Sequence, residues 1–424
     1  MDNKFSRYMI FWLSQSLSRL GSSMTGFALI LWVYTQTGSA MTVSLMSFFN
    51  YVPYIMVSLV AGAFVDRHRK KAIMLVSDSI AAVCSVFILI MSIGCGLQTW
   101  HIYVVNFIIG FMNAFQAPAS AVAIGKIMPK ERLEQVSGLN SFSDNLVAVL
   151  SPIFAAALFG FSSLWLILVI DLCTFAFAFF VLLFVLKIPE DISGEIRKKS
   201  ILKDSMEGFH YLKDHRAIFM TIIALAMMNF FSRLTYENIL SPMILTRSGN
   251  DSMALGIVNT VIGIGGIIGG VIVSMGKIKG NSTKMMYLSA MLSFLLGDIT
   301  MALGKNVLFW SFAGLAASLP VPFITAGSSV ILYRYIPEEM QGRIFAVRNA
   351  IQFSTIPMGI LLGGFLADYV FEPFMMKDNL ITSMLHMLVG TGDGSGMAVM
   401  FLCTGILGSV FSLICYCKKE IQIL

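Results

Sequence analysis

The chain has 424 residues, of which 57% are hydrophobic and only 12% are charged, and its mean hydropathy is +0.81. A soluble domain normally has about a quarter of its residues charged, so this composition excludes a water-soluble globular protein. The net charge of +6 invites a nucleic-acid interpretation, and the distribution of the basic residues along the chain decides against it.

Long apolar runs divide the chain into twelve candidate membrane spans. A spanning helix needs roughly 20 mostly apolar residues. The runs lie approximately at residues 8–33, 42–65, 72–95, 100–124, 140–160, 164–187, 217–244, 253–276, 285–303, 306–332, 344–370 and 397–417. The first run is too long for a cleavable signal peptide, and a second span follows it at once. The sequence therefore predicts an all-α membrane protein with twelve transmembrane helices.

The lysines and arginines lie mostly on one side of these spans. With a cytoplasmic N-terminus, 23 of the 29 face the cytoplasm, three lie within spans and three face outside. The three outer residues are Arg247, Lys305 and Lys377. Short loops rich in Lys and Arg stay in the cytoplasm. We therefore expect a cell-membrane protein with both termini in the cytoplasm, and no nucleic-acid partner.

A long polar connection from Pro189 to about Arg216 divides the spans six and six. The halves resemble each other, because Ser18-Arg19-Leu20 recurs as Ser232-Arg233-Leu234 at an offset of 214 residues. Two six-span halves with a substrate site between them are one known transporter plan. The expected domains are an N-terminal six-helix bundle (1–189), a cytoplasmic linker (190–216) and a C-terminal six-helix bundle (217–424).

The last outer loop, residues 371–396, ends in the glycine-rich stretch Gly390–Gly396. Glycines favour a flexible connection. We expect the preceding segment, Phe371–Met387, to lie along the membrane surface.

A short charged loop, Asp66–Lys71, follows four residues after Gly62. The segment GAFVDRHRKK resembles the Gly-x-x-x-Asp-Arg-x-x-Arg/Lys-Arg/Lys loop between helices 2 and 3 of the major facilitator superfamily of secondary transporters. The chain as a whole resembles the macrolide- and multidrug-efflux branch of that superfamily. The matching stretches are Thr37–Ala40, Asp66–Lys71 with Ser77-Asp78, Asn113–Ala119, Pro129–Leu133, Gly342-Arg343, Pro357–Gly359 and Gly363–Asp368. The resemblance implies two pseudo-symmetric six-helix bundles that alternate their access.

The resemblance also implies that the charged loop is a gate. In the outward-facing state Asp66 meets the N-terminus of span 11, where a carboxylate gains roughly 0.3–1 kcal/mol, and up to about 2 when partly buried. Asp78 is then expected to hold Arg67 or Arg69. The alternative is a plain topogenic charge cluster. The candidate gating residues are Gly62, Asp66, Arg67, Arg69, Lys70, Lys71, Asp78, Arg343 and Arg348.

Charged side chains within spans supply the other candidates. They cost at least ~2.5–3.5 kcal/mol at mid-bilayer on insertion scales, so they line cavities or form pairs. In the family's fold helices 1, 2, 4, 5, 7, 8, 10 and 11 line the cavity. This selects Arg19, Asp144, Arg233 and Glu237. Asp171 and Asp298 lie on the peripheral helices 6 and 9, and we expect them to be structural.

Glu237 is the first candidate for carrying a proton. It lies four residues after Arg233, on the same face of span 7. A carboxylate that alternates between a buried environment and an arginine can bind a proton on one side and release it on the other. Asp144 is the second candidate, and a fixed Arg233–Glu237 ion pair is the alternative. The candidates for contact with substrate are Arg19, Asn113, Gln116, Asn229, Asn349 and Gln352.

The expected function is export of small amphipathic molecules by proton antiport. The sequence has no Gly-x-x-x-x-Gly-Lys-Ser/Thr motif and no metal-ligand spacing of its His residues, so we expect no ATP-driven pump, no enzyme, no metal site and no cofactor. Ser151-Pro152 replaces the Gly-Pro usual in span 5 of drug antiporters. A siderophore or lysolipid carrier of the same fold, or an uncoupled facilitator, therefore stays open. We expect a monomer in the lipid bilayer.

The charge distribution predicts which segments face which side. A cysteine introduced by Asp378→Cys should react with a membrane-impermeant maleimide in intact cells, and one introduced by Gly194→Cys only after permeabilisation. Reaction of both from outside would contradict the twelve-span topology.

Overall fold

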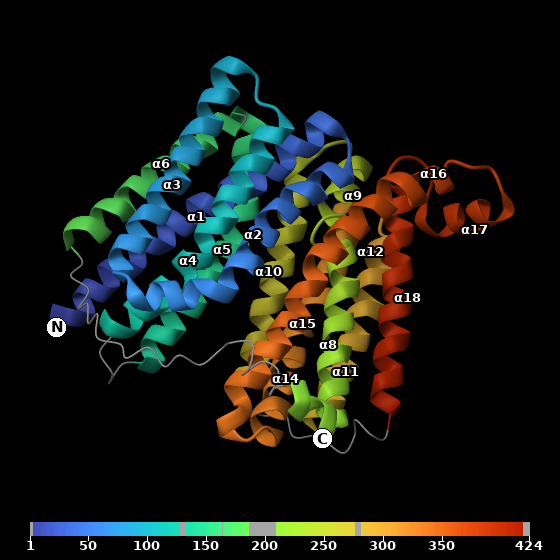
Figure 1. Ribbon diagram of the computed structural model, residues 1–424. Helices are drawn as coiled ribbons and strands as arrows, with labels where there is room; N and C mark the ends of the chain where they lie inside the picture. The colour runs from blue at the N-terminus through green and yellow to red at the C-terminus, as the bar shows by residue number, and fades with distance from the viewer. Residues whose placement is uncertain (1–2, 128–132, 163, 186–208, 276–280, 419–424) are drawn as a thin grey trace. The chain divides into compact units, whose positions relative to one another are not determined.

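The computed structural model describes residues 3–127, 133–162, 164–185, 209–275 and 281–418, and these ranges contain helices and turns but no strand (Figure 1). Within the helices some side chains also lie outside the description, among them those of Asp66, Arg67 and Arg343. The chain forms two compact units, Met1–Gly38 with Leu45–Ile196, and Ser39–Ser44 with Arg197–Leu424. The domain limits at 189 and 216 stay a prediction, because most of the linker lies outside the described residues.

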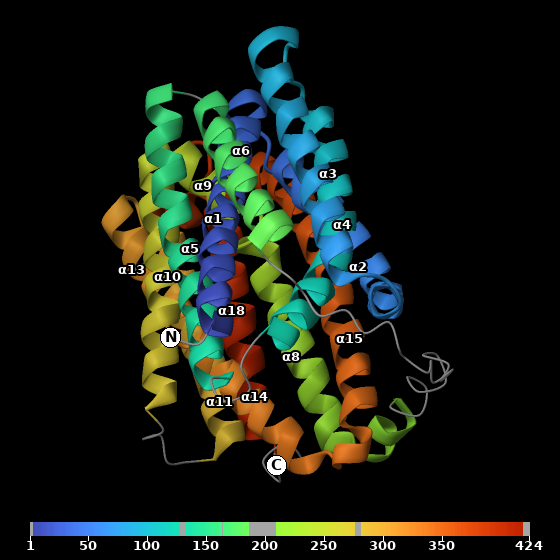
Figure 2. The same cartoon turned by 90° about the vertical axis from the view of Figure 1, so that its left-hand side faces the viewer.

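The first unit contains the six predicted spans of the N-terminal half. The helices are α1 (Asn3–Thr37), α2 (Ala40–Arg67), α3 (Lys70–Ile90), α4 (Thr99–Ile127), α5 (Leu133–Ser162) and α6 (Leu164–Phe180). Short π-helical segments, η1 (Met91–Cys95) and η3 (Val181–Val185), extend α3 and α6. Helix α1 runs between α5 and α6 and contacts both (Figure 2). It is therefore the central helix on which the neighbouring helices of this unit assemble.

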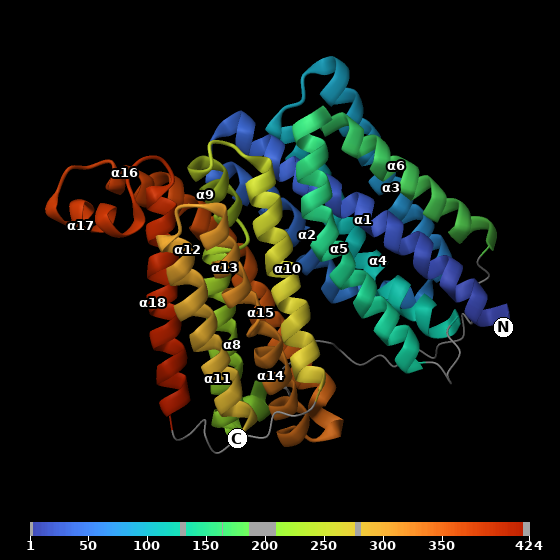
Figure 3. The same cartoon turned by 180° about the vertical axis from the view of Figure 1, so that it is seen from behind.

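The second unit contains the remaining spans, several of which are interrupted. They are α8 (Arg216–Thr235) with α9 (Leu240–Arg247), α10 (Ser252–Ser274), α11 (Ser282–Leu292) with η4 (Ser293–Asp298) and α12 (Ile299–Leu303), α13 (Val307–Ser318) with α14 (Val321–Tyr335), α15 (Glu338–Phe365) with η5 (Leu366–Phe371), and α18 (Ser395–Cys417). The short helices α16 (Glu372–Met375) and α17 (Leu380–Val389) stand between η5 and α18. Helix α18 lies along α11, η4 and α12 (Figure 3).

Eleven helical segments of the described chain are long and apolar enough to cross a membrane. Helix α1 completes the set of twelve. Its 35 residues easily span a bilayer, but Arg19 and a series of serines lower its hydropathy. Four of the described helices contain an internal proline, namely Pro53 in α2, Pro118 in α4, Pro152 in α5 and Pro357 in α15. The prediction of an all-α protein with twelve membrane helices is confirmed.

Buried carboxylates join the peripheral helices in each unit. Asp171 on α6 is 4% exposed and accepts hydrogen bonds from Ser22 at 2.9 Å and Thr25 at 3.2 Å on α1, and from Ser85 at 3.1 Å on α3. Asp298, at the end of η4, accepts one from Thr404 on α18 at 2.8 Å. Hydroxyl donors of this kind offset the cost of burying a carboxyl group. Both residues thus tie neighbouring helices together, and their structural role stays a prediction.

The glycines of α10 show which side of that helix packs. A Cβ at Gly265 would collide with the Ser318 side chain, and one at Gly269 with the Leu319 carbonyl. Gly266 and Gly270 face open space. Glycines four residues apart allow two helices to approach closely, and only the Gly265/Gly269 row of α10 is used in this way.

Candidate functional site

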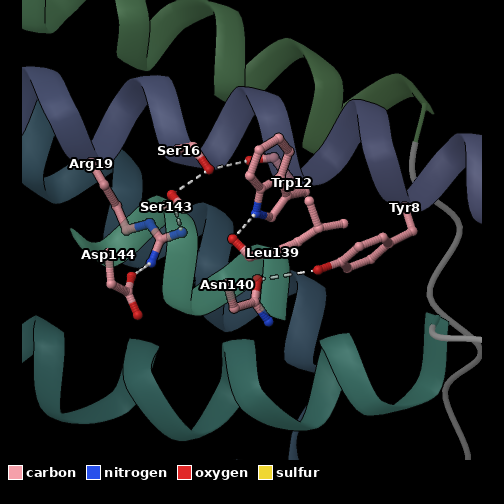
Figure 4. A network of polar contacts seen from close by, with 8 residues as sticks. All are labelled: Tyr8, Trp12, Ser16, Arg19, Leu139, Asn140, Ser143 and Asp144. Carbon is pink, nitrogen blue, oxygen red and sulfur yellow. Dashed lines mark hydrogen bonds and ion pairs between the residues drawn. The ribbon is translucent and has the colours of Figure 1, made fainter. Parts of the chain in front are cut away.

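The first candidate site is an ion pair between α1 and α5 (Figure 4). The Arg19 guanidinium donates to Asp144 Oδ1 at 2.5 Å and to Ser143 Oγ at 3.1 Å. The side chains are 44% and 64% exposed, respectively. Both residues were singled out from the sequence for separate roles, Arg19 for substrate and Asp144 for the proton. The structure brings them together, which sequence reasoning missed because 125 residues separate them.

A row of hydrogen bonds fixes the two helices beside this pair. Residues 8, 12, 16 and 19 of α1 are spaced by three or four positions, so they share one helical face. The bonds are Tyr8 Oη to Asn140 Oδ1 at 3.1 Å, Trp12 Nε1 to the Leu139 carbonyl at 3.1 Å, and Ser143 Oγ to Ser16 Oγ at 2.6 Å. Figure 4 shows the row running from Tyr8 to Arg19. Arg19 is therefore positioned by a network and does not move independently of α5.

The second candidate site is the ion pair of Arg233 and Glu237, at the end of α8. Arg233 occupies the repeat position of Arg19. Its carboxylate partner comes from the same span, four residues on, and not from another helix. The two side chains are 28% and 25% exposed, so this pair is more buried than the first.

The second pair lies at a break in its helix. The sequence predicts one continuous span over 217–244, but α8 ends at Thr235 and α9 begins only at Leu240. Residues 236–239 form a turn that holds Glu237. Interrupted helices mark the binding sites of several transporter folds. The break, which the sequence did not reveal, makes this the stronger candidate for function.

Asp368 caps the first turn of α2, which clusters with the second unit. It accepts hydrogen bonds from Ser39 Oγ at 2.6 Å and from the backbone N–H groups of Ala40 at 3.1 Å and Met41 at 2.9 Å. The first N–H groups of a helix have no partner within it, and its N-terminus favours negative charge. Asp368 meets both demands. Sequence reasoning used this residue only as part of a family motif.

Glycines of α15 make room for this contact. A Cβ at Gly364 would collide with Ser44 on α2, and one at Gly363 with the Leu234 carbonyl on α8. Asn238, 1% exposed, donates to Ser44 Oγ at 2.7 Å and to the Ile360 carbonyl at 2.6 Å. We call residues 39–44, 236–239 and 359–368 the α2–α15 junction. It contains the family-like motif Gly363–Asp368, and Glu237 belongs to it as the sequence neighbour of Asn238.

The predicted gating loop is described only in part. Gly62, Asp66, Arg67 and Arg343 lie outside the described side chains, so the contact of Asp66 with span 11 stays a prediction. Arg69 is exposed at the start of α3, Lys70 is buried, and Lys71 donates to the Leu183 carbonyl at 2.9 Å.

The remaining predicted residues are distributed over both units. Asp78 accepts a hydrogen bond from Gln116 on α4, which joins a gating candidate to a substrate candidate. Arg348 is half-buried on α15. Asn113 and Asn349 are exposed, and Asn229 and Gln352 are half-buried. In the described residues no group of three His, Cys, Asp or Glu side chains could hold a metal ion.

Comparison with known proteins identifies the family. The model of the Major Facilitator Superfamily matches residues 11–279. The chain belongs to the Major Facilitator Superfamily. It is a multi-pass membrane protein that transports small molecules, and it is not an enzyme.

Similar sequences and structures agree with this family. Macrolide efflux protein A of Streptococcus pyogenes is 26% identical over 86% of this chain and 90% of its own. Multidrug efflux pump Tap of Mycolicibacterium fortuitum is 21% identical over 82% and 86%. A bacterial homologue of the lysosomal transporter Spinster has the same fold, with a TM-score of 0.68, 12% identity and coverage of 100% and 97%. A bacterial homologue of ferroportin, with a TM-score of 0.65, 15% identity and coverage of 98% and 99%, also has it.

The Arg19–Asp144 pair predicts a separation of transport from stability. Pairs this exposed contribute only about 0.2–1 kcal/mol to stability. Arg19→Gln and Asp144→Asn should therefore leave abundance and Tm nearly unchanged. Each should lower the transport rate by roughly tenfold, the equivalent of about 1.4 kcal/mol.

The matched control is Tyr8→Phe, which removes a hydrogen bond from the same row without changing charge and should keep transport. Loss of folded protein in either single variant, with recovery in the double variant, would instead make the pair structural.

Proposed function

We propose that this protein exports small amphipathic molecules by proton antiport, with alternating access. The observation that carries the proposal is the half-buried Arg233–Glu237 pair at the break between α8 and α9. A carboxylate at a turn within a spanning helix can change its surroundings when the helix rearranges. The relatives named for macrolide and multidrug efflux support the direction and the kind of cargo.

The charges of the two sites favour neutral or cationic cargo. Arg19 and Arg233 each carry a carboxylate partner, so neither presents an uncompensated positive charge to an anion. Asp144, 64% exposed, leaves part of its carboxylate available to a cationic group. Asn113, Asn349 and the half-buried Asn229 and Gln352 would add neutral hydrogen-bonding groups.

The coupling step that we propose uses Glu237. When Glu237 binds a proton, it loses the charge that holds Arg233, and the pair can separate. When the proton leaves, the pair forms again. The proton is thereby exchanged against cargo, because the ion-paired and protonated states belong to opposite orientations of the carrier. Asp144 with Arg19 is the second candidate for the same step.

Two carboxylates at opposite ends of the same two helices are proposed to hold the alternating states. Asp368, in η5 directly after α15, caps the N-terminus of α2. Asp66, near the end of α2, is proposed to cap the N-terminus of α15 in the opposite state, where it lies beside Arg343 and Arg348. Each contact would be made in one state and lost in the other. We further propose cytoplasmic termini, a cell-membrane location and a monomeric carrier.

Glu237→Gln mimics the protonated form permanently. It should abolish efflux driven by the pH gradient while it preserves substrate binding. The measurement is efflux of a fluorescent substrate from loaded cells, with and without a protonophore.

A fixed ion pair gives a different result. Glu237→Gln would then leave Arg233 without its charge partner in a low-dielectric site and reduce protein abundance, and adding Arg233→Gln would restore it. Efflux by the unmodified protein that continues unchanged under protonophore would overturn proton coupling as a whole.

The two capping carboxylates predict opposite shifts. Asp368→Asn should favour the state in which the α2 cap is released, and Asp66→Asn the state in which it is kept. A charge at a helix N-terminus is worth about 0.3–2 kcal/mol, so the ratio of states should change roughly two- to thirtyfold. Distances between spin labels on the two bundles measure the ratio.

Asp378→Asn serves as the control, because it removes an exposed acid that takes part in neither capping contact. Equal shifts in the same direction for Asp66→Asn and Asp368→Asn would contradict the proposal.

A carrier for siderophores is the second candidate function. The staphyloferrin A transporter of Staphylococcus aureus, 23% identical over 84% of this chain and 89% of its own, favours it. A drug-susceptibility panel in an efflux-deficient bacterium separates the two, because only the drug exporter should raise the resistance of the cells.

A further inference from the structure

The segment between η5 and α18 folds into two short helices and a defined turn. The sequence suggests a flexible glycine-rich connection, but Gly390, Gly392 and Gly394 have φ angles of +92°, +94° and +84° and form a defined turn. This left-handed region is one that L side chains rarely adopt and glycine adopts readily. The glycines therefore shape the return into α18.

Polar contacts secure this segment from the protein side. Glu372 accepts hydrogen bonds from the N–H groups of Gly394 at 3.3 Å and Met397 at 2.9 Å, at the start of α18. Arg247 donates to the Val389 carbonyl at 2.5 Å. Asn379 and Thr382 form a capping box at the N-terminus of α17.

The outward face of α17, in contrast to these polar contacts, is apolar. Leu380, Ile381, Met384, Met387 and Leu388 are 76%, 61%, 60%, 83% and 51% exposed, respectively. Their spacing of i, i+1, i+4, i+7 and i+8 forms one helical stripe. Thr382 is buried and the half-buried His386 bonds to the Met375 carbonyl at 3.1 Å, so these two polar groups point toward the protein. No residue from 380 to 389 is Asp, Glu, Lys or Arg. Ser383 is the one polar side chain among the exposed residues of α17, so the helix has no charged face toward water.

The chain connections keep α17 at the membrane surface. Residues 376–379 join it to the span 347–375, and residues 390–394 join it to the span 395–417. Connections of four and five residues reach at most about 14–18 Å. The apolar stripe thus lies within reach of the headgroup region on that side of the bilayer.

We propose that α17 is an interfacial anchor whose stripe, Leu380 to Leu388, is seated in the lipid bilayer at the boundary of headgroups and acyl chains. Interfacial helices bury an apolar face about 5–10 Å deep in this boundary. Here the polar groups are held by the protein, so the lipid is the occupant that completes the helix. Glu372 joins this segment to the start of α18. The anchor thereby sets the depth in the membrane at which η5 ends and α18 begins.

Spin-label accessibility in proteoliposomes tests the anchor. Nitroxides would be attached at Met387→Cys and, as a second reporter, at Leu380→Cys, in a background without reactive cysteines. Thr391→Cys, exposed in the following turn, is the control. Collisions with oxygen relative to those with an aqueous nickel chelate should be severalfold higher at both reporters than at the control.

Two results would overturn the proposal. Nickel collisions at both reporters equal to those at Thr391→Cys would place α17 in water. Protection from both reagents, with spin–spin broadening between molecules, would show that a second copy of the chain covers the stripe. The measurement does not depend on transport, so a failure of the anchor proposal can be distinguished from a failure of the proposed efflux function.

Discussion

The inability of hydrocarbon to solvate polar groups is the constraint on which this structure depends. Inside a bilayer each backbone or side-chain polar group needs a partner within the protein. Asp171 recruits hydroxyl groups from α1 and α3, and Asp298 recruits one from α18. These contacts hold α6 against α1 and α3, and the end of η4 against α18. The ion pairs of Arg19 and Arg233 obey the same rule in the helices that carry the candidate site.

The repeat gives the two halves equivalent arginines but unequal partners. Arg19 depends on an acid that another helix presents, so its ion pair responds to any movement between α1 and α5. Arg233 and Glu237 belong to one span, and their pair responds to the local geometry of the turn at 236–239. One half is therefore sensitive to the packing of helices and the other to the winding of a single helix. Under the proposed alternating access, this difference would give the two halves different tasks.

Sequence reasoning predicted the spans and the fold class well, because the hydrophobic signal of a membrane helix is local and strong. It also singled out Arg19, Asp144, Arg233 and Glu237, since charges in spans are rare. It could not predict that Arg19 meets Asp144, because pairing across 125 residues depends on helix rotation. The break at 236–239 was missed as well, since its residues are not strong helix breakers. The choice between Gly265 and Gly266 as the packed row likewise depends on rotation about the helix axis.

The prolines inside α2, α4, α5 and α15 have a consequence for motion in a medium without water. Each proline lacks the N–H that would bond to the carbonyl one turn earlier. A helix that bends there breaks no backbone hydrogen bond, because that bond was never made. All four prolines lie in helices that the family resemblance assigns to the cavity lining. Pro53 therefore lets α2 bend within the bilayer without exposing a new unpaired amide to lipid.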